Sequence, residues 1–289
     1  MSDPAKIAAA IRAGPLPSEP FAVALPMYDW PEVRAETDAQ WAAIRYELRM
    51  KGVNAPERLA RRNADLPPVP GGIKDGFGKV IAPDPASLPP DKFDLAVLWQ
   101  HPNLLLSQTC WGPLELWLRG VRVVGQEDYS GIEGGEGEMY SSAIVMRRRL
   151  PPSAAHGRGS SPTRGEVGRP IPPLAGETPA KRAEGGRLSA ASLAGLRLAY
   201  NAPDSMSGIL VLQRGLEAQD SGLHIFRETV ETGGHRASIR SIAEGRADVA
   251  AVDAKTWGLA QRFEPAALEL ALVGWTGKRK GLPFVTAAR

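Results

Sequence analysis

Cysteine and histidine are scarce in this sequence, which holds one cysteine and four histidines in 289 residues. A single thiol cannot form a disulfide within the chain. Its position at Cys110, between Thr109 and Trp111, indicates a packed core thiol rather than a reactive one. The histidines and the cysteine also lack the close spacing of zinc ligands. We therefore expect no bound metal and no other cofactor.

Long hydrophobic runs and a large excess of one charge are also missing. No apolar stretch approaches the roughly 20 residues that a membrane-spanning helix needs, and residues 1–20 lack the apolar segment and cleavage site of a secretory leader. The net charge is only +3, and no basic cluster accompanies a nucleic-acid-binding motif. We expect no membrane insertion, no nucleic-acid partner and, for the sequence as written, a cytoplasmic location.

The most informative stretch runs from Leu198 to Leu216 and reads LAYNAPDSMSGILVLQRGL. Its pattern predicts a short buried strand, a tight turn and the start of an amphipathic helix. Ser205 or Ser207 suits the N-cap of that helix, and Gly208 would let a ligand approach the backbone closely. Unpaired N–H groups at a helix N-terminus attract anions. A cap that serves only its own helix explains the same residues equally simply.

A second glycine-containing turn, Thr232–Ser238, follows another predicted strand and opens a second helix. Beyond it, Ala247–Val252 predicts a buried strand that leads directly to Asp253. Carboxyl ends of parallel strands meet at one edge of a sheet, where open α/β sheets bind ligands. These polar clusters are therefore expected to gather at a single binding edge.

Three segments, AYNAPDSMSG, TGGHRASIRSIAEGRADVAAVDAKTW and GWTGKRKGLPF, together resemble the substrate-binding proteins of phosphate and phosphonate ABC importers. The resemblance extends over about residues 21–284, apart from one inserted segment. It implies an α/β, two-lobed fold of the type II periplasmic-binding-protein kind. Each lobe would be a mixed sheet flanked by helices, with the ligand cleft between the lobes.

The resemblance also implies a function and its partners. The protein would capture a small phosphorus oxyanion (phosphonate, phosphite or phosphate) between its lobes for ABC import. Its partners would be that anion and an importer permease, and the protein itself would be a monomer. Family members are usually periplasmic, which differs from the location expected for this sequence.

In that family the serine-rich turn and the histidine-bearing helix start hold the phosphorus group. Carried over to this sequence, with neighbours chosen by their positions at strand ends, the ligand-binding residues are expected to be Tyr28, Trp99, His101, Tyr140, Ser205, Met206, Ser207, Gly208, His235, Arg236, Ser238 and Asp253. No catalytic residue is expected. Other roles remain open for three of them: Tyr28 as a half-buried aromatic, His101 as a hydrogen-bonded loop residue, and Arg236 as a solvent-facing side chain.

Two other functions use the same residues. A cytoplasmic sensor would bind its ligand in the same cleft and report it to a partner protein. A serine hydrolase would use Ser205 or Ser207 as nucleophile with His235 and Asp253. However, the turn NAPDSMSG does not match the G-x-S-x-G pattern of such enzymes. We therefore expect a binding protein and not an enzyme.

The expected organisation places residues 1–20 in a loose arm, residues 21–128 and 266–281 in lobe 1, and residues 129–265 and 282–289 in lobe 2. Residues 151–188 interrupt lobe 2 with seven prolines, seven glycines and no aromatic residue. Such a composition predicts a flexible insertion. Within lobe 1, the apolar run Phe93–Trp99 predicts a buried strand, and Asn103–Gln108 predicts a helix.

Overall fold

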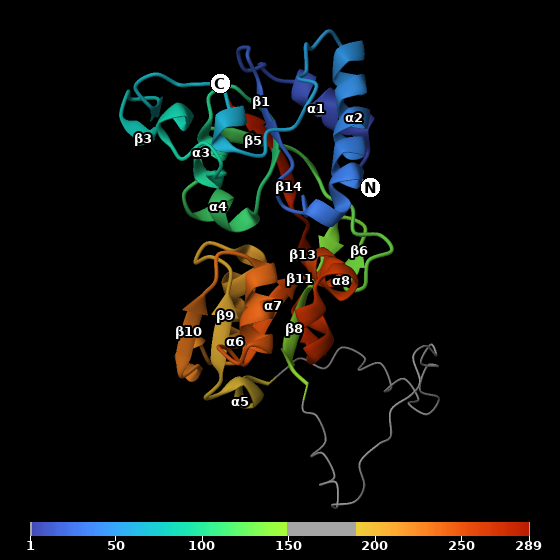
Figure 1. Ribbon diagram of the computed structural model, residues 1–289, viewed down its shortest axis with the longest axis vertical. Helices are drawn as coiled ribbons and strands as arrows, with labels where there is room; N and C mark the ends of the chain where they lie inside the picture. Colours follow the sequence, from blue (N-terminus) through green and yellow to red (C-terminus); the bar gives the residue numbers. More distant parts are fainter. Residues whose placement is uncertain (1, 149–188, 289) are drawn as a thin grey trace, which may run out of the picture.

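A computed structural model describes residues 2–148 and 189–288 of the protein. These residues form two stacked lobes, and both ends of the chain lie in the first lobe (Figure 1). Each lobe contains a mixed sheet flanked by helices, so the two-lobed α/β fold predicted from the sequence is confirmed. Within the described part of the chain, no helix combines the length and apolar character needed to cross a membrane.

The sheet of the first lobe has the strand order β1–β4–β14–β5. Its strands are Ala22–Ala24, Leu104–Gln108, Pro283–Ala287 and Val121–Gln126. One face packs against α1 (Pro4–Arg12) and α2 (Arg34–Met50), and the other packs against α3 (Leu95–Gln100) and the β2–β3 hairpin (Ile73–Lys74 and Val80–Ala82). Helix α4 (Trp111–Leu116) lies on the side that faces the second lobe (Figure 1). Short 3₁₀ turns are η1 (Pro31–Val33), η2 (Asn63–Asp65) and η3 (Pro85–Ser87).

The sheet of the second lobe has the order β10–β9–β11–β8–β12. Its strands are Glu228–Glu231, Arg197–Tyr200, Val249–Asp253, Ser142–Arg147 and Leu270–Trp275. Strands β9, β10 and β11 are parallel, and β8 runs antiparallel to β11 and β12. Helices α7 (His235–Ala243) and α8 (Ala254–Phe263) cover one face, and α5 (Ala190–Leu193) and α6 (Val211–Glu217) cover the other. The remaining turns are the π-helical η4 (Met206–Leu210) and the 3₁₀ turns η5 (Leu223–Ile225) and η6 (Pro265–Glu269).

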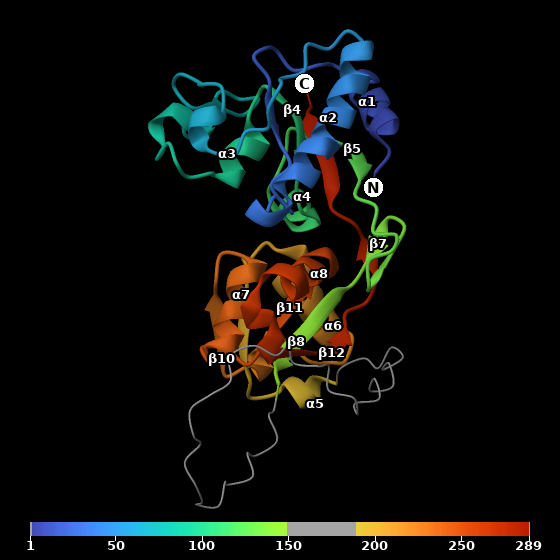
Figure 2. The same cartoon turned by 45° about the vertical axis from the view of Figure 1, so that its right-hand side comes forward.

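Two connections join the lobes. The first leaves β5 and passes through β6 (Gly135–Glu136) and β7 (Met139–Tyr140), and the second returns through β13 (Arg279–Lys280). These strands pair in the order β13–β7–β6 at the side of the molecule, between the lobes (Figure 2).

The expected division of the chain differs from the sheets in its last part. Residues 266–281 were expected in lobe 1, but β12 pairs with β8 in the second sheet. Residues 282–289 were expected in lobe 2, but β14 lies between β4 and β5 in the first sheet. Two short apolar strands at the end of a chain look alike locally, and only pairing with distant strands assigns them to a sheet. The inserted segment 151–188 lies outside the described residues.

Three local predictions for the first lobe are wrong. The expected loose arm contains α1, which Asp3 caps and whose Ile7 and Ile11 are buried against α2 and β5. The run Phe93–Trp99 contains helix α3 rather than a strand, because Asp94 caps it by accepting from the Val97 N–H group. The buried strand in this part of the chain is β4, all of whose residues are buried. It occupies most of Asn103–Gln108, the segment that was expected to form a helix.

Candidate functional site

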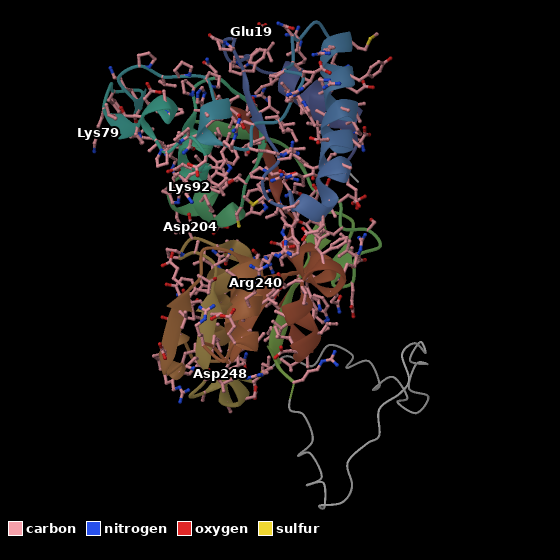
Figure 3. All side chains as sticks on the ribbon, in the orientation of Figure 1. Glu19, Lys79, Lys92, Asp204, Arg240 and Asp248 are labelled. Atoms are coloured by element: carbon pink, nitrogen blue, oxygen red, sulfur yellow. The ribbon has the colours of Figure 1, made fainter. Side chains whose placement is uncertain are left out.

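A cavity of about 140 Å³ lies between the two lobes. Tyr28 and Trp99 line it from the first lobe, and polar residues of the second lobe line it from the opposite side: Asn201, Asp204, Ser205, Ser207, His235, Asp253 and Thr256. Figure 3 shows Asp204 at the junction of the lobes, below α4. The cavity therefore lies at the carboxyl ends of β9 and β11, where the sequence predicts a binding edge.

The serine turn follows β9 and is held by hydrogen bonds of its own. Ser205 is the N-cap residue, and its Oγ accepts a 3.2 Å bond from the Gly208 N–H group. A Cβ atom on Gly208 would lie 2.1 Å from Oδ1 of Asn201. Glycine at this position therefore makes room for the Asn201 side chain rather than directly for a ligand.

Ser207 and His235 form the central pair of the cavity wall. Ser207 Oγ lies 2.8 Å from His235 Nε2 and 3.4 Å from Ser205 Oγ. The Ser207 carbonyl accepts a 2.6 Å bond from Ser142 Oγ of β8, which holds the turn against the sheet. Burial, assisted by the positive charge of Arg279, lowers the pKa of His235 to about 3. The imidazole is therefore neutral at physiological pH.

Helix α7 begins at His235, and its N-cap residue is Gly234, which has no side chain to cap the helix. The first-turn N–H groups of α7 are thus available to an anion. His235 Nδ1 is buried and has no hydrogen-bond partner among the described residues. Oδ1 of Asn201 is a second buried atom without such a partner in this part of the chain. A buried polar group is costly to leave unpaired, so both atoms are candidates for ligand contacts.

Asp253 ends β11 and caps α8. Its Oδ1 accepts bonds from the N–H groups of Lys255 and Thr256, at 2.9 and 3.1 Å, and its Oδ2 accepts a 3.0 Å bond from the Tyr28 hydroxyl. Burial raises the pKa of Asp253, and the capping bond from Thr256 opposes that rise. The carboxylate is an acceptor on the cavity wall, suited to a proton-bearing group of a ligand.

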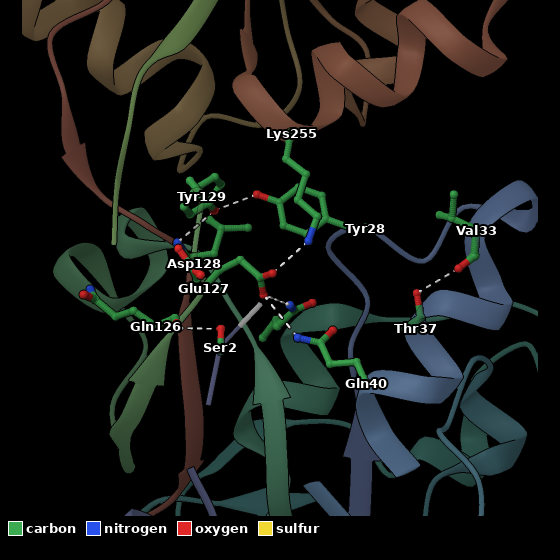
Figure 4. A network of polar contacts seen from close by, with 12 residues as sticks. Ser2, Tyr28, Val33, Thr37, Gln40, Gln126, Glu127, Asp128, Tyr129 and Lys255 are labelled. Atoms are coloured by element: carbon green, nitrogen blue, oxygen red, sulfur yellow. Dashed lines mark hydrogen bonds and ion pairs between the residues drawn. The ribbon is translucent and has the colours of Figure 1, made fainter. Parts of the chain in front are cut away.

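Tyr28 belongs to a buried polar network that joins the lobes (Figure 4). Its hydroxyl lies 2.7 Å from that of Tyr129. Close by, Lys255 of the second lobe forms a 2.8 Å ion pair with Glu127, and its Nζ lies 4.4 Å from the centre of the Tyr28 ring. Glu127 is 1% exposed and also accepts a bond from Gln108. Tyr28 is thus both a cavity wall and an inter-lobe contact.

Six residues expected at the ligand lie elsewhere than on the cavity wall. His101 Nε2 bonds to the Pro67 carbonyl, and burial lowers its pKa. Tyr140 stacks on Tyr129, and Ser238 bonds to Thr232 at 2.7 Å. The Met206 side chain faces a separate cavity of the second lobe, and Gly208 lies behind Asn201. Their positions in the sequence, several of them at the ends of predicted strands, placed these residues near the site. Which side chains reach the cavity depends on tertiary packing.

Arg236, the sixth, faces neither the cavity nor open solvent. Its guanidinium pairs with Glu32 of the first lobe at 2.8 Å and with the buried Glu264 at 2.6 Å. It also lies 4.3 Å from the centre of the Trp30 ring. Arg236 is therefore an inter-lobe contact, and its charge is matched by two carboxylates.

Sequence reasoning missed three polar wall residues: Asn201, Asp204 and Thr256. All three lie inside the segments that carry the family resemblance, so that signal was present for each of them. Among the described residues no lysine or arginine lines the inter-lobe cavity. An anion there would be bound by neutral donors: the serine hydroxyls, the imidazole and the open N-terminus of α7.

Comparisons with known proteins bear on the family resemblance of the chain. Residues 174–284 match the model of the family described as ABC transporter, phosphonate, periplasmic substrate-binding protein, which confirms the resemblance predicted from the sequence. No curated protein matches.

Several solved structures are similar over 63% of this chain. PhnD1 from Prochlorococcus marinus in complex with methylphosphonate shares 16% identity, with a TM-score of 0.44. A binding protein component of an ABC phosphonate transporter from Pseudomonas aeruginosa shares 14%, with a TM-score of 0.42. The periplasmic aliphatic sulphonate binding protein SsuA from Escherichia coli shares 14%, with a TM-score of 0.36. The matches cover 56%, 50% and 47% of those chains, so this chain spans about half of their length.

Proposed function

We propose that this chain, which resembles the phosphonate substrate-binding proteins of ABC transporters over residues 174–284, captures a small phosphorus oxyanion in the inter-lobe cavity. The ligand would be a phosphonate, phosphite or phosphate, and an importer permease would receive it. The observation that carries the proposal is the Ser207–His235 pair at 2.8 Å, beside the uncapped N-terminus of α7.

Neutral donors would bind the oxyanion without a salt bridge. Hydrogen bonds to a charged acceptor contribute about 1.5–3 kcal/mol each, and micromolar affinity requires about 8 kcal/mol net. Donors from Ser205, Ser207, His235 and the α7 backbone are enough to reach that value. Asp253 would repel a fully ionised ligand, so the site favours an anion that carries a proton or an ammonium group toward this carboxylate.

The hydrolase alternative is not favoured by this geometry. Asp253 bonds to Tyr28 and to the start of α8, and no bond to His235 is present in the described part of the chain. With a pKa of about 3, the imidazole is also a weak general base at neutral pH. Within the described part of the chain no third residue orients His235, as a catalytic triad requires, because its Nδ1 atom has no partner there.

The proposal is tested by calorimetric titration of the protein with methylphosphonate, phosphite, phosphate and sulfate. We expect one phosphorus compound to bind, and both Ser207→Ala and His235→Gln to weaken it at least about tenfold, because each removes one charge-assisted hydrogen bond. The matched controls are Ser192→Ala and His224→Gln, whose side chains are exposed and distant from the cavity. If the folded protein binds none of these anions, or if the site variants bind like the controls, the proposed function is wrong.

A further inference from the structure

A second and larger cavity, of about 350 Å³, lies within the second lobe. It opens between α6 and the segment that runs from the end of β12 into β13, which lie side by side in Figure 2. Ile144 of β8 and Leu193 of α5 contribute to its wall. Its volume is in the range of ordinary small-molecule sites, whereas the inter-lobe cavity is well below that range.

The wall of this second cavity combines an apolar surface with positive charge. Leu212, Leu216 and Trp275 provide much of the apolar part. Three cations also line it: Arg214, Lys278 and Arg279. Among the residues placed by the structure, no aspartate or glutamate lines this cavity. This combination is the reverse of the inter-lobe cavity, whose described wall has two carboxylates, those of Asp204 and Asp253, and no cation.

Among the residues that the structure describes, only one of the three cations has no carboxylate partner. Arg214 pairs with Glu115, and Lys278 pairs with Glu136. Arg279 instead bonds to two neutral hydroxyls, Ser142 Oγ at 2.6 Å and Thr276 Oγ1 at 3.1 Å. Within the described ranges its buried Nε atom has no hydrogen-bond partner, and its guanidinium forms no ion pair with a carboxylate.

The guanidinium of Arg279 is also fixed in place. It lies 4.1 Å from the centre of the buried Tyr140 ring, and the two hydroxyls hold its Nη atoms. A fixed guanidinium beside an apolar cavity is the arrangement that recognises a planar anionic head with a hydrophobic body. A free phosphate or a phosphonate with a short substituent would leave the apolar wall unfilled.

We propose that this cavity is a second ligand site, which binds an amphipathic carboxylate of medium chain length. The carboxylate pairs with Arg279, and the hydrocarbon body lies against Leu212, Leu216 and Trp275. The ligand class proposed for this site differs from the phosphorus oxyanion proposed for the inter-lobe cavity. Two polar links join it to that cavity within the described part of the chain: Ser142, which accepts a bond from Arg279 and donates one to the Ser207 carbonyl, and the charge of Arg279, which acts on His235 and Asp253.

Gly215 of α6 offers a way to close this cavity without touching Arg279. It lines the cavity, and a Cβ atom placed on it would meet nothing within 4 Å. Gly215→Leu therefore fills the cavity from the helix side. Gly258 of α8 is a matched control, because its Cβ position is equally open and it lines neither cavity.

The experiment follows displacement of the fluorescent probe 1-anilinonaphthalene-8-sulfonate by octanoate and by 1-octanol, on proteins that show a cooperative thermal transition. We expect octanoate to displace the probe at least about tenfold more strongly than octanol, since only octanoate pairs with Arg279. Arg279→Gln should remove this advantage, and Gly215→Leu should abolish displacement by both compounds. Gly258→Leu should behave like the unchanged protein.

Equal displacement by octanoate and octanol from the unchanged protein would overturn the proposal, as would normal octanoate binding by Gly215→Leu. Methylphosphonate titration of each variant separates this site from the proposed function. Gly215→Leu is expected to keep its methylphosphonate affinity while losing octanoate. A protein that binds octanoate and no phosphorus anion would contradict only the proposed function.

Discussion

The Tyr28 hydroxyl of the first lobe donates a 3.0 Å hydrogen bond to Oδ2 of Asp253 in the second lobe. Both side chains are almost completely buried and both line the inter-lobe cavity. The same contact therefore holds the lobes together and shapes the wall of the candidate site. A ligand that engages Asp253 would act directly on the attachment between the lobes.

Replacing Tyr28 tests this contact. Tyr28→Phe leaves Asp253 and the Tyr129 hydroxyl each short of one buried partner, which should lower the free energy of unfolding by about 1–3 kcal/mol. Urea unfolding measures the change. The control is Tyr46→Phe, because Tyr46 is 62% exposed on α2. Equal stability of the two variants would show that the inter-lobe hydrogen bond contributes nothing.

The lowered pKa of His235 predicts a loss of stability in acid. Its pKa is about 3 in the folded protein and about 6.5 in an unfolded chain. As the pH falls below about 6.5 the unfolded chain binds a proton and the folded protein does not. The stability contributed by neutral His235 is therefore complete above pH ~6.5 and is lost progressively toward pH ~3.

This prediction is checked by urea unfolding at pH 7 and at pH 5. Between pH 7 and pH 5, the free energy of unfolding of His235→Gln should fall by about 2 kcal/mol less than that of the unchanged protein. His224→Gln is the control, since His224 is exposed. His101, whose pKa is also lowered, remains in all three proteins and does not affect the comparison. An identical pH dependence for His235→Gln and the unchanged protein would contradict the assignment of a neutral imidazole at His235.

Arg236 and Arg240 form a matched pair of variants. Both guanidiniums contact Glu264 on η6's N-terminal side, but only Arg236 also reaches Glu32 of the first lobe. Arg236→Gln should therefore loosen the contact between the lobes, and Arg240→Gln should not. Small-angle X-ray scattering should show a larger radius of gyration for Arg236→Gln alone. Equal radii for both variants would mean that the Arg236–Glu32 pair does not hold the lobes together.

Gly112 allows the backbones of the two lobes to approach each other. A Cβ atom on this α4 residue would lie 1.7 Å from the carbonyl oxygen of Asp204 in the serine turn. Gly112→Ala should keep the lobes apart, increase the radius of gyration and weaken methylphosphonate binding at least about tenfold, because the cavity can no longer form from both sides. Gly258→Ala provides the control. A variant Gly112→Ala with normal scattering and affinity would show that the lobes do not need this approach.

Much of the second lobe could be predicted from the sequence because its signals are local. Ser205, one of the two serines expected as an N-cap, is the N-cap residue of η4. Helix α7 begins at His235 and ends before Gly245, and β11 leads directly into Asp253. A cap, a glycine stop and a buried apolar run each depend on neighbours within a few residues. The family resemblance lies in the same segments, and it supported the prediction that their polar ends form one binding edge.

What the sequence by itself determined is therefore the set of strand–turn–helix units, their polar ends and the two-lobed α/β class. Tertiary structure alone decided which lobe receives β12 and β14, and that Arg236 turns to Glu32 rather than to the cavity. It also left Arg279 without a carboxylate beside an apolar cavity. The physical reason is that pairing and burial depend on partners more than a hundred residues away, which local pattern and spacing do not specify.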